Sequence, residues 1–192
     1  MTDTFPLVHA HRVVLRQLTH ADAPRLLTIH SDPEVMRWFG ADPIRQPEEA
    51  ITLIDMFNAR WSDPVPGVRW AIQRRSDGVL LGTCGLGRWN RSWHSAVTGY
   101  ELARDAWGHG YMAEALGAAL GWGWARMALN RVEAQIHPDN AASIRLVEKL
   151  GFVREGLLRQ AGHWNGQYQD LLQYALLKAD FARADLQRSD VR

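Results

Sequence analysis

Two glycines, Gly108 and Gly110, stand where a strand-like run gives way to a helix-like run in "YELARDAWGHGYMAEALGAAL", residues 100–120. Glycine in a helix interior costs about 1 kcal/mol relative to alanine, so its use at this junction needs a reason. The first N–H groups of a helix lack intrahelical partners, and the helix dipole makes that end positive. Glycine lets a large anion such as a pyrophosphate approach these N–H groups, although a tight turn that binds nothing explains the pattern equally well.

The common phosphate-binding motifs do not account for these glycines. A dinucleotide-binding fingerprint requires a third glycine and an all-parallel sheet, whereas this strand belongs to a meander. A P-loop ends in Gly-Lys-Ser/Thr, which the segment lacks. A metal site is not expected either, because the 8 histidines show no H-x-x-x-H spacing. The single cysteine, Cys84, is interpreted as a small buried side chain.

A second helix start carries polar side chains in its first turn. In "NAASIRLVEKL", Asn140 is a good N-cap, which places Ser143 at the third helical position. Gly151 is expected to end this helix in the left-handed conformation. The helix dipole favours a negative charge beside Ser143, but from the residues alone simple capping explains both polar side chains.

The elements that position these two helix starts predict an α+β domain with a mixed, mostly antiparallel sheet. Periodicity gives helices early in the chain, then a meander of strands with hairpin turns at Asp77-Gly78 and Asn165-Gly166. One β-α-β crossover is expected, from a strand over 97–103 through a helix over 109–127 to a strand over 132–137.

Length and charge narrow the class of protein. A chain of 192 residues is most simply a single domain, 1–192, of which about 178–192 form a charged tail. The 22 basic and 21 acidic side chains give a net charge of +1, so there is no electrostatic case for binding nucleic acid or an anionic membrane. Neither a signal peptide nor an apolar run of the ~20 residues that span a bilayer is recognisable. A cytoplasmic protein is expected.

A family resemblance rests on five segments in order: "HRVVLRQLTHADAPRLLTIHSDPEVMRWF", "WAIQRRSDGVLLGTCGL", "TGYELARDAWGHGYMAEAL", "HPDNAASIRLVEKLGF" and "HWNGQYQDLLQYALL". The chain resembles the GNAT superfamily of acetyl-CoA-dependent N-acetyltransferases, and within it the branch that acetylates ribosomal-protein N-termini (the RimJ/RimL type). The resemblance covers nearly the whole chain. It implies the GNAT fold, a central splayed sheet flanked by helices, and transfer of acetyl from acetyl-CoA to a primary amine by direct attack in a ternary complex.

The resemblance implies that acetyl-CoA is the co-substrate. Backbone N–H groups at 107–112 would hold its pyrophosphate, and the strand end at 101–104 would pair with the pantetheine arm. The broad superfamily reads Gln/Arg-x-x-Gly-x-Gly/Ala at this loop, and the different residues found here are usual in the branch. The residues assigned to the co-substrate are Leu102, Ala103, Arg104, Trp107, Gly108, His109, Gly110, Tyr111, Met112 and Asn140.

For catalysis, the resemblance implies Ser143 as the general acid for the leaving thiolate, with Asn140 organising the turn. Many other branches use a tyrosine as the acid, and the matching stretch here offers none.

Glu101, a lone glutamate in an apolar strand, is the candidate base, acting on the amine directly or through a water. An ion pair with Arg104 or Arg131 explains this glutamate about equally well. His137, at the end of the next strand, is a second candidate base.

The sequence does not reveal the acceptor. A primary amine is expected to enter opposite acetyl-CoA, along Trp38, Trp93 and Trp164, although such an aromatic edge is also typical of a homodimer contact. The acceptor would be a small-molecule amine or the N-terminus of a ribosomal or other protein. The alternatives to an enzyme are a non-catalytic acyl-CoA-binding module and a ribosome-associated structural partner.

Overall fold

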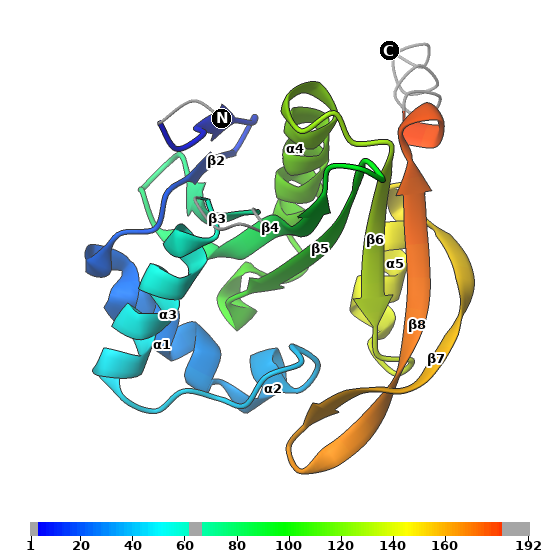
Figure 1. The fold of residues 1–192 in the computed structure, drawn as a ribbon. Helices are drawn as coiled ribbons and strands as arrows, with labels where there is room; N and C mark the ends of the chain where they lie inside the picture. Colours follow the sequence, from blue (N-terminus) through cyan, green and yellow to red (C-terminus); the bar gives the residue numbers. More distant parts are fainter. Residues whose placement is uncertain (1–3, 62–66, 182–192) are drawn as a thin grey trace.

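An eight-stranded sheet in the order β1-β2-β3-β4-β5-β6-β8-β7 forms the scaffold of the protein (Figure 1). The computed structural model describes residues 4–61 and 67–181. The elements in chain order are β1 (Val8–His9), β2 (Val13–Arg16), η1 (His20–Asp22), α1 (Ala23–Ser31), α2 (Pro33–Met36), α3 (Pro47–Ala59), β3 (Val68–Arg74), β4 (Leu80–Asn90), β5 (Ser95–Leu102), η2 (Arg104–Ala106), α4 (Tyr111–Arg126), β6 (Arg131–Ile136), α5 (Ala141–Lys149), β7 (Val153–Trp164) and β8 (Gln167–Leu177).

The sheet is mixed, as predicted, because one neighbouring pair is parallel and the others are antiparallel. The parallel pair is β5 and β6, which α4 connects, so the predicted crossover is confirmed with bounds that differ by at most two residues. The two predicted hairpins are also confirmed: β3-β4 turns at Asp77-Gly78, and β7-β8 turns at Asn165-Gly166. In the latter turn φ is 52° at Asn165 and 70° at Gly166, the conformation that suits the twist of a hairpin.

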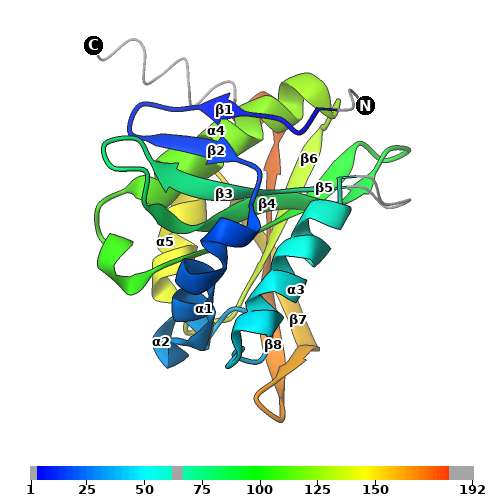
Figure 2. The same ribbon diagram turned by 90° about the vertical axis from the view of Figure 1, so that its left-hand side faces the viewer.

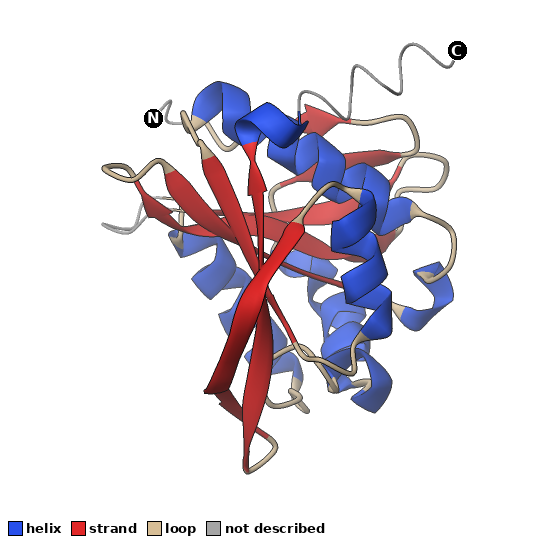
Figure 3. Ribbon diagram, turned by 90° about the vertical axis from the view of Figure 1, so that its right-hand side faces the viewer, coloured by secondary structure: helices blue, strands red, loops and turns tan. Residues whose placement is uncertain are grey.

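Helices cover both faces of the sheet, as Figures 2 and 3 show from opposite sides. The alternation of side chains along β3 explains the two layers. Trp70 and Ile72 pack in the larger core, with α4 and α5, whereas Ala71 packs in the smaller core, with α1 and α3. Each strand in the middle of the sheet therefore presents successive side chains to different helices.

The end of α5 has the hydrogen bonds of a Schellman motif. The N–H of Phe152 donates to Val147 O at 3.0 Å, and the N–H of Gly151 donates to Glu148 O at 3.0 Å. Gly151 has a φ of 96°, and Phe152 is 4% exposed, so the predicted left-handed cap is confirmed.

Two further expectations concern the ends and surface of the chain. Among the described helices, none combines the length and apolar character needed to cross a bilayer. The predicted tail lies mostly outside the described residues, and its first part, 178–181, is helical.

Replacing Gly151 by alanine is expected to lower the free energy of unfolding by about 1–2 kcal/mol, because a Cβ disfavours the left-handed conformation. A steric clash would not cause this loss of stability, since the added Cβ would meet only Leu176 Cδ1, at 3.5 Å. Gly156→Ala is the matched control, because its Cβ would meet nothing within 4 Å. Urea unfolding of both variants measures the difference, and equal stabilities would contradict the role of Gly151 as the cap.

Candidate active site

The pairing of β5 with β6 stops part-way along the two strands. Ser95–Val97 pair with Arg131–Glu133, and beyond these residues the strands diverge (Figure 1). A cavity of about 730 Å³ opens at this point, lined by 98–102 of β5, 134–136 of β6, the loop before α4, the start of α5, and α2. The inner edges of both strands are free of each other here, and such edges can pair with an amide-bearing ligand.

The loop before α4 has the geometry expected of an anion cradle. Gly108 and Gly110 have φ values of 76° and 78°, and Gly110 is the N-cap of α4. A Cβ on Gly108 would meet nothing within 4 Å, so the glycine is required for its conformation and not for lack of space. Because the first N–H groups of α4 have no intrahelical acceptor, the loop fits the pyrophosphate of coenzyme A.

An arginine that the sequence analysis did not identify holds this loop. Arg12 donates from Nη1 to His109 O at 2.9 Å and from Nε to Glu114 Oε2 at 2.8 Å. Its guanidinium also lies over the ring of Tyr111, 4.8 Å from the centroid. Burial opposes ionisation of Glu114, but the hydrogen bonds and charge of Arg12 prevail and lower the pKa of this carboxyl. A single surface arginine gives no sequence signal for such a role.

Some of the other predicted co-substrate residues line the cavity and some do not. Leu102, Trp107, Tyr111, Met112 and Asn140 line the cavity with the two glycines.

Three predicted co-substrate side chains do not line the cavity. The N–H of Ala103 is used by Leu81 O, at 2.8 Å, and Arg104 pairs with Asp32 at 2.8 Å. His109 is exposed, and its Nδ1 lies 2.7 Å from Trp107 O, so the ring is folded back onto the loop. The predicted contacts of 101–104 and 107–112 with the co-substrate are made by their backbone, so these side-chain positions do not test the assignment, which stays a prediction.

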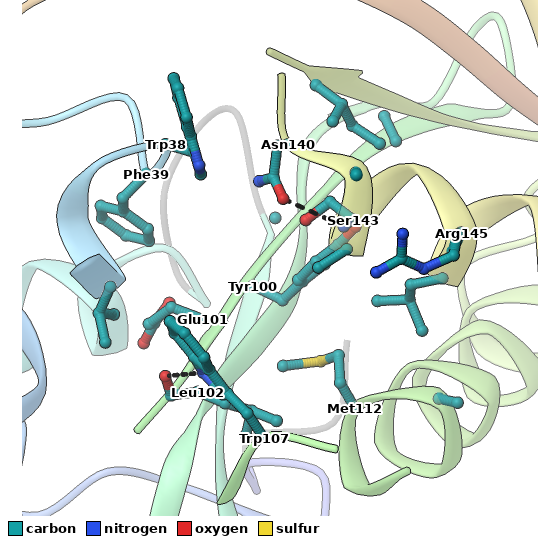
Figure 4. Close-up of a pocket in the computed structure, with 18 of the residues that line it drawn as sticks. Trp38, Phe39, Tyr100, Glu101, Leu102, Trp107, Met112, Asn140, Ser143 and Arg145 are labelled. Atoms are coloured by element: carbon teal, nitrogen blue, oxygen red, sulfur yellow. Dashed lines mark hydrogen bonds between the residues drawn. The ribbon is translucent and has the colours of Figure 1, made fainter. Parts of the chain in front are cut away.

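The start of α5 matches the sequence prediction. Asn140 Oδ1 accepts a hydrogen bond from Ser143 N at 3.1 Å, which confirms Asn140 as the N-cap (Figure 4). Ser143 lines the cavity and is half-buried, so its hydroxyl lies beside the positive end of the helix.

A tyrosine next to Ser143 is the main functional candidate that the sequence analysis missed. Figure 4 shows Tyr100 reaching from β5 toward the first turn of α5. Its hydroxyl oxygen is buried and has no hydrogen-bond partner of good geometry among the described residues. Burial raises the pKa of Tyr100 to about 12, although the Ser143 side chain acts to lower it. A buried hydroxyl without a firm partner, aimed into a cavity, is available to a ligand.

Glu101 points to the other side of β5, toward α2, and is part of a buried network (Figure 4). Arg69 donates to Oε2, the Thr83 hydroxyl donates to Oε1 at 2.6 Å, and His30 Nε2 lies 3.3 Å from Oε1. Burial opposes ionisation, but the charge of Arg69 and the bonds of His30 and Thr83 prevail, so the pKa of Glu101 is lowered.

The two predicted ion-pair partners of Glu101 are wrong. Arg104 reaches Asp32, and Arg131 binds Glu133 and Glu155 at 2.8 and 2.5 Å. The partner is instead Arg69 of β3, two strands away in the sheet.

The predicted second base, His137, has both ring nitrogens engaged. Its Nδ1 accepts from Asp139 N at 3.1 Å, and its Nε2 lies 3.2 Å from Gln169 Oε1. Its ring stacks on Trp38 with centroids 4.2 Å apart, so His137 supports Trp38 and does not itself line the cavity.

Two of the three predicted acceptor-side tryptophans come together. Trp38 and Trp164 line a second cavity of about 560 Å³, which shares Trp38, Phe39 and part of β5 with the first. Trp164 is buried, and its Nε1 donates to Arg37 O at 3.2 Å. Trp93 is corrected: it lies in the β4-β5 turn, is 79% exposed and lines neither cavity.

Side chains suited to a metal ion do not cluster. Within the described residues, no group of three or more His, Cys, Asp or Glu side chains lies close enough to hold an ion.

Comparisons with known proteins define the class. The sequence profile of the acetyltransferase (GNAT) domain matches residues 12–153. The uncharacterized N-acetyltransferase YoaA of Bacillus subtilis is 34% identical over 174 residues, 91% of this chain and 98% of its own.

Solved structures of named acetyltransferases share the fold. The structure of Mycobacterium smegmatis RimJ in complex with CoA-disulfide has a TM-score of 0.84 at 21% identity and covers 96% of this chain and 95% of its own. The structure of Vibrio cholerae spermidine N-acetyltransferase with CoA and spermine has a TM-score of 0.77 at 22% identity and covers 89% and 98%.

The chain belongs to the GNAT family of acetyltransferases. It is an acetyl-CoA-dependent N-acetyltransferase with the GNAT fold, so the predicted family, fold and reaction class are confirmed.

Gly110→Glu is expected to abolish the stabilisation of the fold by coenzyme A. At 100 times the dissociation constant, a bound ligand adds about 2.7 kcal/mol to the free energy of unfolding. The variant places a side chain and a negative charge in the cradle. The ligand-induced shift is measured for each protein against its own ligand-free state, so strain at a φ of 78° does not enter the comparison.

Gly121→Glu, on an exposed face of the same helix, is the matched control and should keep the full shift. Equal ligand-induced shifts in wild type and Gly110→Glu would contradict the assignment of this loop as the pyrophosphate site.

Glu101→Gln is expected to lower the free energy of unfolding by about 3–5 kcal/mol at pH 7, because Arg69 stays buried without its counter-charge. The pKa of Glu101 is depressed, so its stabilisation is fully present above the ordinary carboxyl value of 4.5 and is lost as the pH falls through the folded-state value. The difference in free energy of unfolding between wild type and Glu101→Gln should therefore stay constant above pH 4.5 and narrow only below it.

Glu133→Gln removes a carboxylate from a partly exposed pair with Arg131 and should cost only ~0–1 kcal/mol. Denaturant titrations from pH 7 to pH 3 measure both variants. If Glu101→Gln lowers the free energy of unfolding only slightly, or if its difference from wild type does not change on acidification, the network does not stabilise the fold.

Proposed function

We propose that the protein acetylates a primary amine by direct attack, with acetyl-CoA and the amine bound together. The observation that carries the proposal is the opening between β5 and β6, which joins the cradle before α4 to the aromatic side chains of Trp38 and Phe39, just after α2. Acetyl-CoA supplies the acetyl group as a thioester. The cavity on the α2 side leaves a separate approach for the amine.

In the balanced reaction the amine loses one proton and the sulfur gains one. We assign Ser143 as the relay, because its hydroxyl lies beside the positive end of α5, where developing negative charge is stabilised. Giving one proton to the sulfur and taking one from the nitrogen leaves the serine unchanged.

Tyr100 is assigned a different task from Ser143. Its pKa of about 12 is far above that of a thiol, roughly 8.5, so it holds its proton and donates a hydrogen bond. That bond is available both to the Ser143 hydroxyl and to the sulfur.

Glu101 is proposed to act on the amine through its charge. A nitrogen becomes positive as it attacks a carbonyl, and an ionised carboxylate nearby stabilises that charge. The lowered pKa and the occupied oxygens make Glu101 a weak direct base, so any proton would reach it through a water.

The acceptor is proposed to be the α-amine of a protein N-terminus or the amine of a small molecule. A ribosomal-protein N-terminus, as in the RimJ/RimL branch, is one candidate, and a cytoplasmic site of action belongs to this proposal. The names of the structural relatives support both acceptor types, because one is RimJ and another is a spermidine N-acetyltransferase.

Release of free thiol from acetyl-CoA against a panel of primary amines tests the function. Ser143→Ala is expected to lower kcat by ~100-fold, with little change in the KM for acetyl-CoA, because the relay acts as the sulfur departs. Tyr100→Phe removes one hydrogen bond to a charged group, worth roughly 1.5–3 kcal/mol, or about 10–150-fold in kcat.

Tyr168→Phe, an exposed tyrosine of the β7-β8 hairpin, is the control and should leave kcat unchanged. No amine-dependent thiol release, with coenzyme A still bound, would instead identify a non-catalytic acyl-CoA-binding module. Unchanged turnover in both active-site variants would remove the two hydroxyls from the mechanism.

A further inference from the structure

The second cavity, on the acceptor side, has an unusual set of charges. Its lining includes the arginines Arg60, Arg69 and Arg88, together with His163. No aspartate or glutamate is among the described residues that line it. Although the chain has almost equal numbers of acidic and basic side chains, the charged side chains among the described residues that line this space are all arginines.

The three arginines do not contribute equally to the charge of the cavity. The charge of Arg69, on β3, is offset by its ion pair with Glu101, on β5. A Cβ on Gly99 would lie 3.2 Å from Arg69 Nη1, so this glycine lets the guanidinium pass to its partner. Arg60 lies over the ring of Phe57, with 5.2 Å between its Cζ and the centroid.

Arg88 is held in the cavity wall by an irregularity of the backbone. The register of β4 with β5 shifts between Gly87 and Asn90, so Arg88 lies in a bulge. Its φ is 50°, a conformation that side chains other than glycine seldom adopt. Bulges near active sites re-aim a side chain, and strained backbone at such a place points to a function.

The Arg88 guanidinium is exposed, and within the part of the chain that the structure describes it pairs with no carboxylate. The neighbouring Arg91 differs, because its guanidinium stacks on Trp89, 4.7 Å from the ring centroid, and lies outside both cavities. Of the two nearby arginines, the one in the bulge therefore lines the acceptor cavity and the other does not.

We propose that this cavity is an anion subsite, and that the acceptor is a primary amine carrying a carboxylate or phosphate group that Arg88 binds. This inference rests on the proposed function, since it concerns the second substrate of the same reaction. An arginine fork binds a carboxylate or phosphate through two parallel hydrogen bonds. A polyamine, which carries several positive charges and no anion, is the acceptor that this lining selects against.

Initial rates for matched pairs of amines test the subsite. Phosphoethanolamine is compared with ethanolamine, and an α-amino acid with its amide, so that each pair differs by the anionic group and the two pairs separate phosphate from carboxylate. The anionic member should have the higher kcat/KM by at least ~10-fold, with spermidine the poorest acceptor. The preference should shrink as salt is added.

Variants of the bulge identify the residue responsible. Arg88→Gln should remove the preference by raising the KM of the anionic acceptor, with the rate of the neutral one unchanged. Arg88→Lys should restore part of it, and Arg91→Gln should behave as wild type. Binding of phosphoethanolamine by calorimetry gives a readout that does not depend on turnover.

The outcomes separate the two proposals. If no amine reacts but phosphoethanolamine binds wild type and not Arg88→Gln, the acetylation proposal fails and the anion subsite stands. If amines react but neutral and anionic members do so equally, or spermidine is preferred, or Arg88→Gln keeps the preference, the subsite is overturned. Absence of both reaction and binding overturns it as well.

Discussion

The buried carboxylate of Glu101 determines how the central strands and α1 are held together. Glu101 lies in the middle of the sheet, beside the point where β5 and β6 separate, and an ionised group there is costly unless it is paired and hydrogen-bonded. Its partners come from three different elements: Arg69 from β3, Thr83 from β4 and His30 from α1. Removing any of them leaves a polar group unsatisfied, so the network holds strands and helix in one arrangement.

The separation of the strands and this network support each other. Past Val97 and Glu133 no backbone bonds join β5 to β6, so the open edge must be fixed from elsewhere. On one face of β5 the network binds the strand to the α1 side. On the other face, Tyr100 packs against the core that contains α4 and α5. The open edge of β5 is therefore fixed on both faces of the strand.

Local features of the site could be predicted from the sequence, and long-range ones could not. Gly110 and Asn140 begin the helices that follow them, so residue type and spacing were sufficient to predict the two helix starts, although not what they bind. The partner of Glu101 is 32 positions away and depends on sheet order, which periodicity does not determine. Tyr100 was missed because alternation assigns it and Glu101 to opposite faces, and only the separation of the strands brings both into one cavity. The position of Trp93 in a loop gave no information on the side from which that loop faces the site.

The two-sided cavity has a consequence for how such an enzyme diversifies. The loop before α4 and the start of α5 line the first cavity, whereas the segment 38–40 after α2, the β4 bulge and the β7-β8 hairpin line the second. Mutations at well-separated sites without shared partners act almost independently. Under the proposed function, substitutions in the bulge or the hairpin therefore exchange one acceptor for another while the acyl-donor side is left intact, so a gene duplicate acquires a new substrate in a few substitutions.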